Sequence, residues 1–218
     1  MKSQPHPHSA MRQDGGLSRR SVLSAGMALT GGSLLAGARN VFAQAGDTIK
    51  IGSARAMTGL VASSFAPLYV GVKIAVEEIN GAGGMLGKKI EIIEADDESS
   101  PAKEPAVMRK LIDGGGQAIL GPVGSSHTLA AVPTTTAAKM IHAGGGWSEE
   151  LADGVKYPYQ YQFTYNTGHQ GEAIVRHIVE KLKMKKVGIL QENTGLGESG
   201  GAATVRSLKK YGLDPVAI

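Results

Sequence analysis

From Thr48 onward the chain alternates short apolar runs with longer amphipathic segments, and this alternation constrains the fold more than any other feature. Strand patterns are expected over residues 48–54, 89–94, 117–120, 139–142, 159–164, 186–190 and 215–218. Helix patterns are expected over residues 67–80, 101–113, 126–138, 170–182 and 197–211. Parallel neighbouring strands need a connection of a dozen or more residues, and helices supply it here. The sequence therefore predicts an α/β fold with doubly wound parallel sheets.

The first 45 residues have the layout of a cleavable bacterial export signal of the twin-arginine type. Arg19 and Arg20 stand directly before an uncharged run over residues 22–38, and small residues place the expected cleavage near Ala43 or Ala45. The alternative is a retained membrane anchor, but glycine and serine make the run weakly hydrophobic. We expect an exported, periplasmic protein.

The net charge of +4 belongs to this leader. Residues 1–45 hold five of the 23 basic residues and one of the 19 acidic ones, so the remainder is formally neutral. A neutral body gives no electrostatic reason to expect a nucleic-acid partner. The absence of cysteine from the sequence excludes both disulfides and thiolate metal ligands.

Polar residues follow three of the predicted strands, over residues 57–64, 121–128 and 144–148. Ligands of open α/β sheets bind beyond the carboxyl ends of the strands, so these junctions are candidates for one shared cleft. Ser125 and Ser126 stand at the start of a predicted helix, a position that suits a carboxylate or phosphate. The alternatives are that a serine only caps the helix, that Trp147 packs in a core, and that the glycines only form turns.

Two further motifs give weaker signals. Residues 195–200 fit the dinucleotide pattern G-x-G-x-x-G, which supports the alternative of an exported NAD(P)-dependent oxidoreductase, but four residues separate the predicted strand from the first glycine. Residues 96–98 resemble paired carboxylates, and we interpret them as a solvated strand end. No catalytic residue, cofactor or metal site is predicted, and the protein is not expected to be an enzyme.

The chain resembles the periplasmic receptors of branched-chain amino-acid ABC transporters, the Leu/Ile/Val-binding type. The matching segments are IKIGSARAMTG (49–59), GVKIAVEEINGAGGMLGKKIEIIEADDESSP (71–101), AILGPVGSS (118–126), WSEEL (147–151), HQGEAIVRHIVEKL (169–182) and KKVGILQENTGLGESG (185–200). The resemblance implies a periplasmic binding protein fold of type I, a small-molecule ligand held between two lobes, and an ABC permease as partner. It implies a monomer when full length.

The resemblance also assigns binding positions. The serine that binds the ligand carboxylate falls on Ser125. The backbone carbonyl and the hydroxyl after the next strand, which hold the ligand's ammonium and carboxylate groups, fall on Gly146 and on Trp147 or Ser148. Other positions depart from the pattern. Ser64 replaces an aromatic residue, Leu196 a tyrosine and Thr167 an acidic residue. The lost acid weakens the case for an ammonium-bearing ligand, so we expect a small carboxylate-bearing molecule, an amino acid or a related organic acid.

Length is the largest departure, since members of this family run to roughly twice the length that follows the leader. Residues 46–164 are expected to form most of one lobe, and residues 165–218 the start of a second, truncated lobe. We expect the isolated chain to be poorly stable, because the missing segments would cover exposed faces of the sheets. A non-functional fragment is the remaining alternative.

Overall fold

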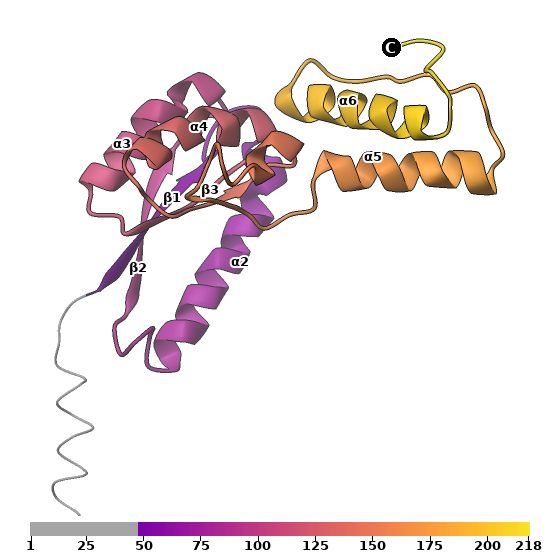
Figure 1. Ribbon diagram of the computed structural model, residues 1–218. Coiled ribbons are helices and arrows are strands. Elements are labelled where there is room, and N and C mark those ends of the chain that lie inside the picture. The colour runs from indigo at the N-terminus through magenta and orange to yellow at the C-terminus, as the bar shows by residue number, and fades with distance from the viewer. Residues whose placement is uncertain (1–47) are drawn as a thin grey trace, which may run out of the picture. The chain divides into compact units, whose positions relative to one another are not determined.

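The computed structural model describes residues 48–218, and its centre is a five-stranded parallel sheet (Figure 1). The strands are β1 (Ile49–Arg55), β2 (Ile90–Asp96), β3 (Ala118–Val123), β4 (His142–Gly145) and β5 (Gln160–Gln162). Their order is β2-β1-β3-β4-β5, and each pair is parallel. The parallel α/β fold expected from the alternation is confirmed.

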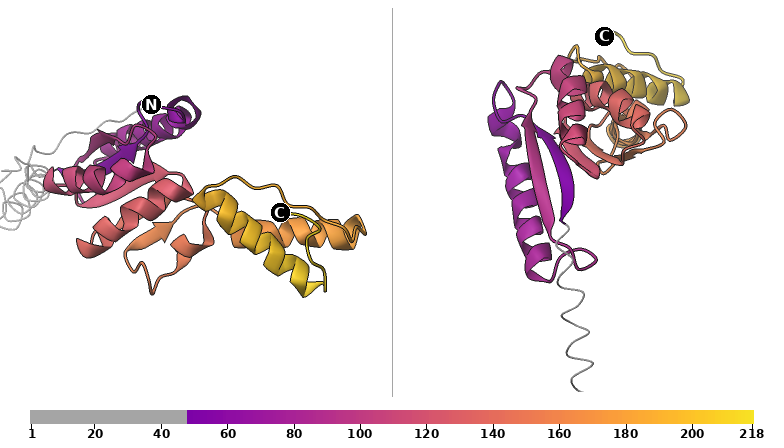
Figure 2. Two further views of the ribbon diagram at one scale, coloured as in Figure 1. Left: turned by 90° about the horizontal axis from the view of Figure 1, so that it is seen from above. Right: turned by 90° about the vertical axis from the view of Figure 1, so that its left-hand side faces the viewer.

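Helices cover both faces of this sheet. The helix α2 (Ala62–Gly81) lies on one face, and α3 (Glu104–Asp113) and α4 (Ser125–Ala137) lie on the other (Figure 2). Short 3-10 turns precede α3 (Pro101–Lys103) and follow β4 (Glu149–Ala152). None of the described helices is long and apolar enough to cross a membrane.

The helices α5 (Thr167–Arg176) and α6 (Gly195–Lys210) pack on each other beyond the sheet (Figure 1). A π-helical turn over His177–Lys181 extends α5. The described residues belong to one compact unit, so the division of the chain at residue 164 into lobes stays a prediction. The expected leader over residues 1–45 lies outside the described residues.

The largest buried cluster lies between the sheet and the α3–α4 layer. It consists of Ala54, Ala95, Val107, Met108, Leu111, Ile119 and Ala131. Small residues on β1 and β2 let the side chains of α3 approach the sheet closely. A Cβ atom on Gly52 would lie 2.7 Å from the side chain of Ile119 and 3.0 Å from that of Leu111. Packing of this density fixes α3 and α4, and with them the turns at the carboxyl edge of the sheet.

Three sequence expectations differ from the structure. The strand expected over residues 139–142 is displaced, because Lys139 lies in a turn with φ of 52° and β4 begins only at His142. The helix expected from Pro67 begins at Ala62, because the Oγ atom of Ser99 accepts the N–H of Val61 (3.1 Å) and anchors the chain one turn earlier. The strands expected over residues 186–190 and 215–218 do not form, and only an isolated parallel bridge joins Gly188 to Ala217. A two-stranded pair with no further strand beside it gains too little packing to extend.

Asp96, at the end of β2, organises the turn that follows β1. Its carboxylate accepts hydrogen bonds from the N–H of Met57 (2.8 Å), from the hydroxyl of Thr58 (2.7 Å) and from the N–H of Glu98 (2.9 Å). Desolvation opposes ionisation, but these hydrogen bonds together outweigh it and lower the pKa of Asp96 to about 2. The first and second strands therefore end in one shared polar turn.

His142 joins three elements inside the core. Its ring is fully buried, with Nε2 2.7 Å from the carbonyl oxygen of Gly121 and Nδ1 3.1 Å from the hydroxyl of Thr135. Desolvation lowers the pKa of His142 to about 4, although the hydrogen bond with Gly121 opposes this change. The ring is therefore neutral in the folded chain at pH 7.

We expect His142 to make the fold acid-sensitive. Its folded-state pKa is below the unfolded value of 6.5, so its stabilisation is complete above pH 6.5 and is lost as the pH falls towards 4. The contribution of His142 to the unfolding free energy should fall by about 2 kcal/mol between pH 7 and pH 5. Urea denaturation of the wild type and of His142→Gln at each pH measures it as the difference between the two pH profiles. His169→Gln, at an exposed position, should keep the wild-type profile; equal profiles in His142→Gln and His169→Gln would contradict the assignment.

Candidate functional site

Ser125 connects the start of α4 to the end of β4. It is the first residue of α4, it is buried, and Gly124 precedes it with φ of 113°. Its Oγ atom accepts hydrogen bonds from the N–H groups of Trp147 (2.9 Å) and Ser148 (3.0 Å). These two donors occupy both lone pairs of the hydroxyl, so its proton is the group left to bind an acceptor.

The alternative that a serine side chain only caps α4 is wrong. Gly124 holds the capping position, and no side chain closes the first turn of α4. Ser126 instead accepts the N–H of Gly195 at 2.9 Å, which ties the start of α4 to the start of α6. Both hydroxyls thus bind residues distant in sequence rather than the backbone of their own helix.

Gly146 has a buried carbonyl that already accepts two donors. The side-chain amide of Gln162 lies 2.9 Å from this oxygen and the hydroxyl of Thr164 lies 2.8 Å from it. The site is tight, because an added Cβ atom would lie 2.3 Å from the side chain of Leu151 and 3.2 Å from the Cα atom of Ser125, so a larger residue would require Leu151 to move. The carbonyl that the resemblance assigns to a ligand ammonium is therefore occupied by donors of the protein itself.

A chain of hydrogen bonds continues from β4 to α6. The carbonyl of Trp147 accepts the N–H of Thr167 at 2.8 Å, and the buried hydroxyl of Thr167 lies 2.6 Å from that of Ser199. Ser199 also accepts the N–H of Glu149 at 3.0 Å. Trp147 is half-buried and belongs to neither buried cluster, so core packing does not account for it. These hydrogen bonds thus join predicted site residues from three separate segments, namely Ser125, residues 147–148 and Thr167.

Residues 195–200 are helical and do not form the turn that a dinucleotide fingerprint requires. The hydroxyl of Thr194 caps α6 by accepting the N–H of Gly197 at 3.2 Å, and the N–H of Gly195 binds Ser126. These N–H groups are the ones that a pyrophosphate would need. Leu196, in the first turn of α6, lines a mostly apolar cavity of about 310 Å³ together with Thr167.

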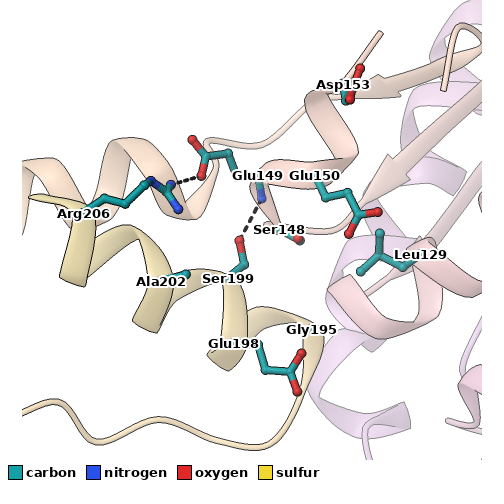
Figure 3. A pocket seen from close by; sticks show the side chains of 10 residues that line it. All are labelled: Leu129, Ser148, Glu149, Glu150, Asp153, Gly195, Glu198, Ser199, Ala202 and Arg206. Atoms are coloured by element: carbon teal, nitrogen blue, oxygen red, sulfur yellow. Dashed lines mark hydrogen bonds and ion pairs between the residues drawn. The ribbon is translucent and has the colours of Figure 1, made fainter. Parts of the chain in front are cut away.

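A second cavity of about 440 Å³ lies between the turn after β4 and α6 (Figure 3). It is lined by Leu129, Ser148, Glu149, Glu150, Asp153, Gly195, Glu198, Ser199, Ala202 and Arg206. The lining includes four carboxylates and one guanidinium, and this guanidinium, that of Arg206, forms an ion pair with Glu149. Among the predicted site residues only Ser148 lines this cavity.

Sequence reasoning missed Ser199 and Arg206, which α6 brings to the turn after β4 from about fifty residues away. The only local signal was their place on the helix predicted over residues 197–211, Ser199 in its first turn and Arg206 further along. Ser64 is the opposite case. It is exposed on α2, and no hydrogen bond or cavity described here joins it to the other predicted residues.

Comparisons with known proteins agree on one family. Residues 48–218 match the family model described as periplasmic binding protein. A Leu/Ile/Val-binding protein of Escherichia coli K12 is 31% identical over 166 residues, which cover 75% of this chain and 45% of that protein. A Leu/Ile/Val/Thr-binding protein of Salmonella typhimurium is 30% identical over 172 residues, which cover 78% and 47% respectively.

Solved structures give the same result. A type 1 periplasmic binding protein from Bordetella pertussis has a TM-score of 0.72 at 29% identity, and the match covers 78% of this chain and 48% of that one. A branched-chain amino acid transporter substrate-binding protein from Streptococcus pneumoniae, solved with isoleucine, has a TM-score of 0.67 at 29% identity, with 78% and 49% covered. The chain thus spans about half the length of the relatives it matches.

The two serines of α4 should differ in their contribution to stability. Ser125→Ala removes the acceptor of two N–H groups at a buried position, and we expect it to lower the unfolding free energy by about 1–3 kcal/mol. Ser126→Ala removes the acceptor of one half-buried N–H and should cost about 1 kcal/mol or less. Ser64→Ala, at an exposed position, should change it by less than about 0.5 kcal/mol. Urea denaturation measures all three, and a cost at Ser126 above that at Ser125 would contradict the assignment.

Proposed function

The chain belongs to the periplasmic binding protein family, and on this basis we propose that it functions in an extracytoplasmic solute receptor for a small carboxylate-bearing molecule. The ligand is an amino acid or a related organic acid, delivered to an ABC transporter. The observation that carries the proposal is the environment of Ser125 at the carboxyl end of β3. The curated relatives are amino-acid-binding proteins, which supports the same class of ligand.

The Ser125 turn suits a carboxylate for two physical reasons. The hydroxyl proton of Ser125 is free to donate, because the N–H groups of Trp147 and Ser148 use its lone pairs. The first N–H groups of α4 have no partner within their own helix, and the helix dipole makes this end positive. A carboxylate oxygen placed here would accept the hydroxyl proton and meet a favourable potential.

The surroundings favour a carboxylate more than an ammonium group. The carbonyl of Gly146 accepts two protein donors, and Thr167, at the position of a family acid, binds Ser199 with its hydroxyl. An ammonium group placed there would have to displace these partners. We therefore infer that the ligand need not be a branched-chain amino acid, and that Ser148, Trp147 and Leu196 shape the part of the site beyond the carboxylate.

The remaining expectations about the whole protein are part of this proposal. We propose that residues 46–164 and 165–218 belong to two lobes that close on the ligand, and that the full-length receptor is a monomer that docks on an inner-membrane permease without catalysing a reaction. The neutral charge of residues 46–218 gives no support to a nucleic-acid partner. The predicted twin-arginine signal supports a periplasmic location.

A thermal-shift screen of the 218-residue chain tests the ligand class. Amino acids, aliphatic acids and aromatic acids should be compared, each beside its methyl ester. A ligand present at 100 times its dissociation constant should stabilise the chain by about 2.7 kcal/mol, and its ester should not, because the ester lacks the anionic oxygen that the Ser125 turn binds.

Two results would contradict the proposal. Stabilisation by leucine, isoleucine and valine alone would limit the ligands to branched-chain amino acids, against the inference drawn from the surroundings of Ser125. Equal stabilisation by an acid and its ester would show that the carboxylate is not the recognised group. Because the ester control changes the ligand and not the protein, it remains informative whatever the stability of the Ser125→Ala variant.

A further inference from the structure

Three chemically active side chains meet at the carboxyl edge of the sheet, beside the Ser125 turn but outside the site described above. Asp97 directly follows β2, Glu104 begins α3 and His127 lies in the first turn of α4. One carboxylate oxygen from each acid and one ring nitrogen all lie within 4.8 Å of one another. The interpretation of residues 96–98 as a solvated strand end is wrong for Asp97, which is only 1% exposed.

Asp97 and Glu104 are buried, His127 is half-buried, and three polar atoms of the cluster lack a hydrogen-bond partner in the described part of the chain. Glu104 is fully buried, and neither of its carboxylate oxygens has a hydrogen-bond partner among the described residues. The Nε2 atom of His127 is likewise buried without a partner. Groups of this kind cost free energy unless something neutralises them or binds them. Their convergence suits a positively charged ligand.

Backbone contacts hold Asp97 and His127 in place. The Oδ1 atom of Asp97 accepts the N–H of Ser99 at 2.7 Å, and the N–H of Asp97 binds the carbonyl of Arg55 at 3.1 Å. Gly124 lets the imidazole of His127 lie against the backbone, since an added Cβ atom there would be 3.0 Å from Nδ1. A prearranged set of ligands loses little entropy when an ion binds.

The electrostatics agree with the geometry. Burial, and then the charge of Asp97, raise the pKa of Glu104 to about 9, and burial likewise raises the pKa of Asp97. Burial, followed by the charge of Asp97, also raises the pKa of Tyr69, whose hydroxyl is buried without a partner. The surroundings thus disfavour two negative charges unless a cation accompanies them.

We propose that Asp97, Glu104 and His127 bind a divalent transition-metal ion of the zinc class. Two carboxylates and one imidazole suit Zn²⁺ or its neighbours, whereas Mg²⁺ and Ca²⁺ prefer oxygen ligands alone. Ligand atoms around one tetrahedral zinc ion lie about 3.4 Å apart, so the cluster needs only small side-chain movements. The ion would join β2, α3 and α4 at the edge that also carries Ser125.

Titration of the chelator-treated 218-residue chain with Zn²⁺ tests this proposal. Isothermal titration calorimetry should show one strong site, and both Glu104→Gln and His127→Gln should weaken it by at least about tenfold. Glu104→Gln keeps the shape of the side chain without its charge, so its melting temperature without metal should match that of the wild type. Zn²⁺ should raise the melting temperature of the wild type and not that of Glu104→Gln.

A control is needed for His6 and His8, which lie close together in the sequence and are themselves possible Zn²⁺ ligands. The double variant His6→Ala/His8→Ala should keep the strong site. Bound Co²⁺ should also change its visible absorption in His127→Gln, which reports direct ligation by the imidazole. Loss of the site in the double variant alone, or equal Zn²⁺ affinity in wild type and Glu104→Gln, would overturn the proposal and favour a proton shared by Asp97 and Glu104. The ligand screen is a separate measurement, so its failure would leave this result standing.

Discussion

The hydroxyl of Ser125 is the contact on which the arrangement of the sheet edge depends. A parallel sheet delivers all its strand ends to one edge, but it does not determine how the following turns meet there. By accepting two N–H groups from the segment after β4, Ser125 fixes that segment against the start of α4. The position of Gly146, and through Trp147 that of Thr167, follows from this contact.

The sequence predicted β1, β2, β3 and β5, the parallel pairing and the three polar junctions, because each depends on a local pattern of apolar residues, but it placed the fourth strand three residues too early. It did not predict what depends on contacts between distant segments. Asp97 looked solvated because nothing in its neighbourhood shows that Glu104 and His127 pack on it. The strand expected over residues 186–190 failed for a related reason, since its pattern is strand-like but only Ala217 pairs beside it in the described part of the chain. Whether such a segment forms a strand depends on the availability of a pairing strand more than on the strand propensity of its residues.

Two neighbouring networks share the first turn of α4. Ser125 belongs to the network that reaches β4 and α5, and His127, two residues later, belongs to the cluster with Asp97 and Glu104. Backbone movement of this turn would disturb both networks, since a helical turn moves as a unit. An ion held by the cluster would therefore also restrain the Ser125 hydroxyl, and a ligand on Ser125 would restrain His127. Such coupling between sites is reciprocal by thermodynamic necessity.

The distribution of charge decides from which side a carboxylate can approach. The cavity between the turn after β4 and α6 carries four carboxylates, and its one guanidinium is already paired with Glu149. An anion entering there would be repelled, and exposed ion pairs of this kind provide little compensating field. The start of α4 offers the opposite potential, with a free hydroxyl proton and the positive end of a helix. A carboxylate-bearing ligand would therefore orient its anionic end toward Ser125, and the acidic cavity would oppose the reversed orientation.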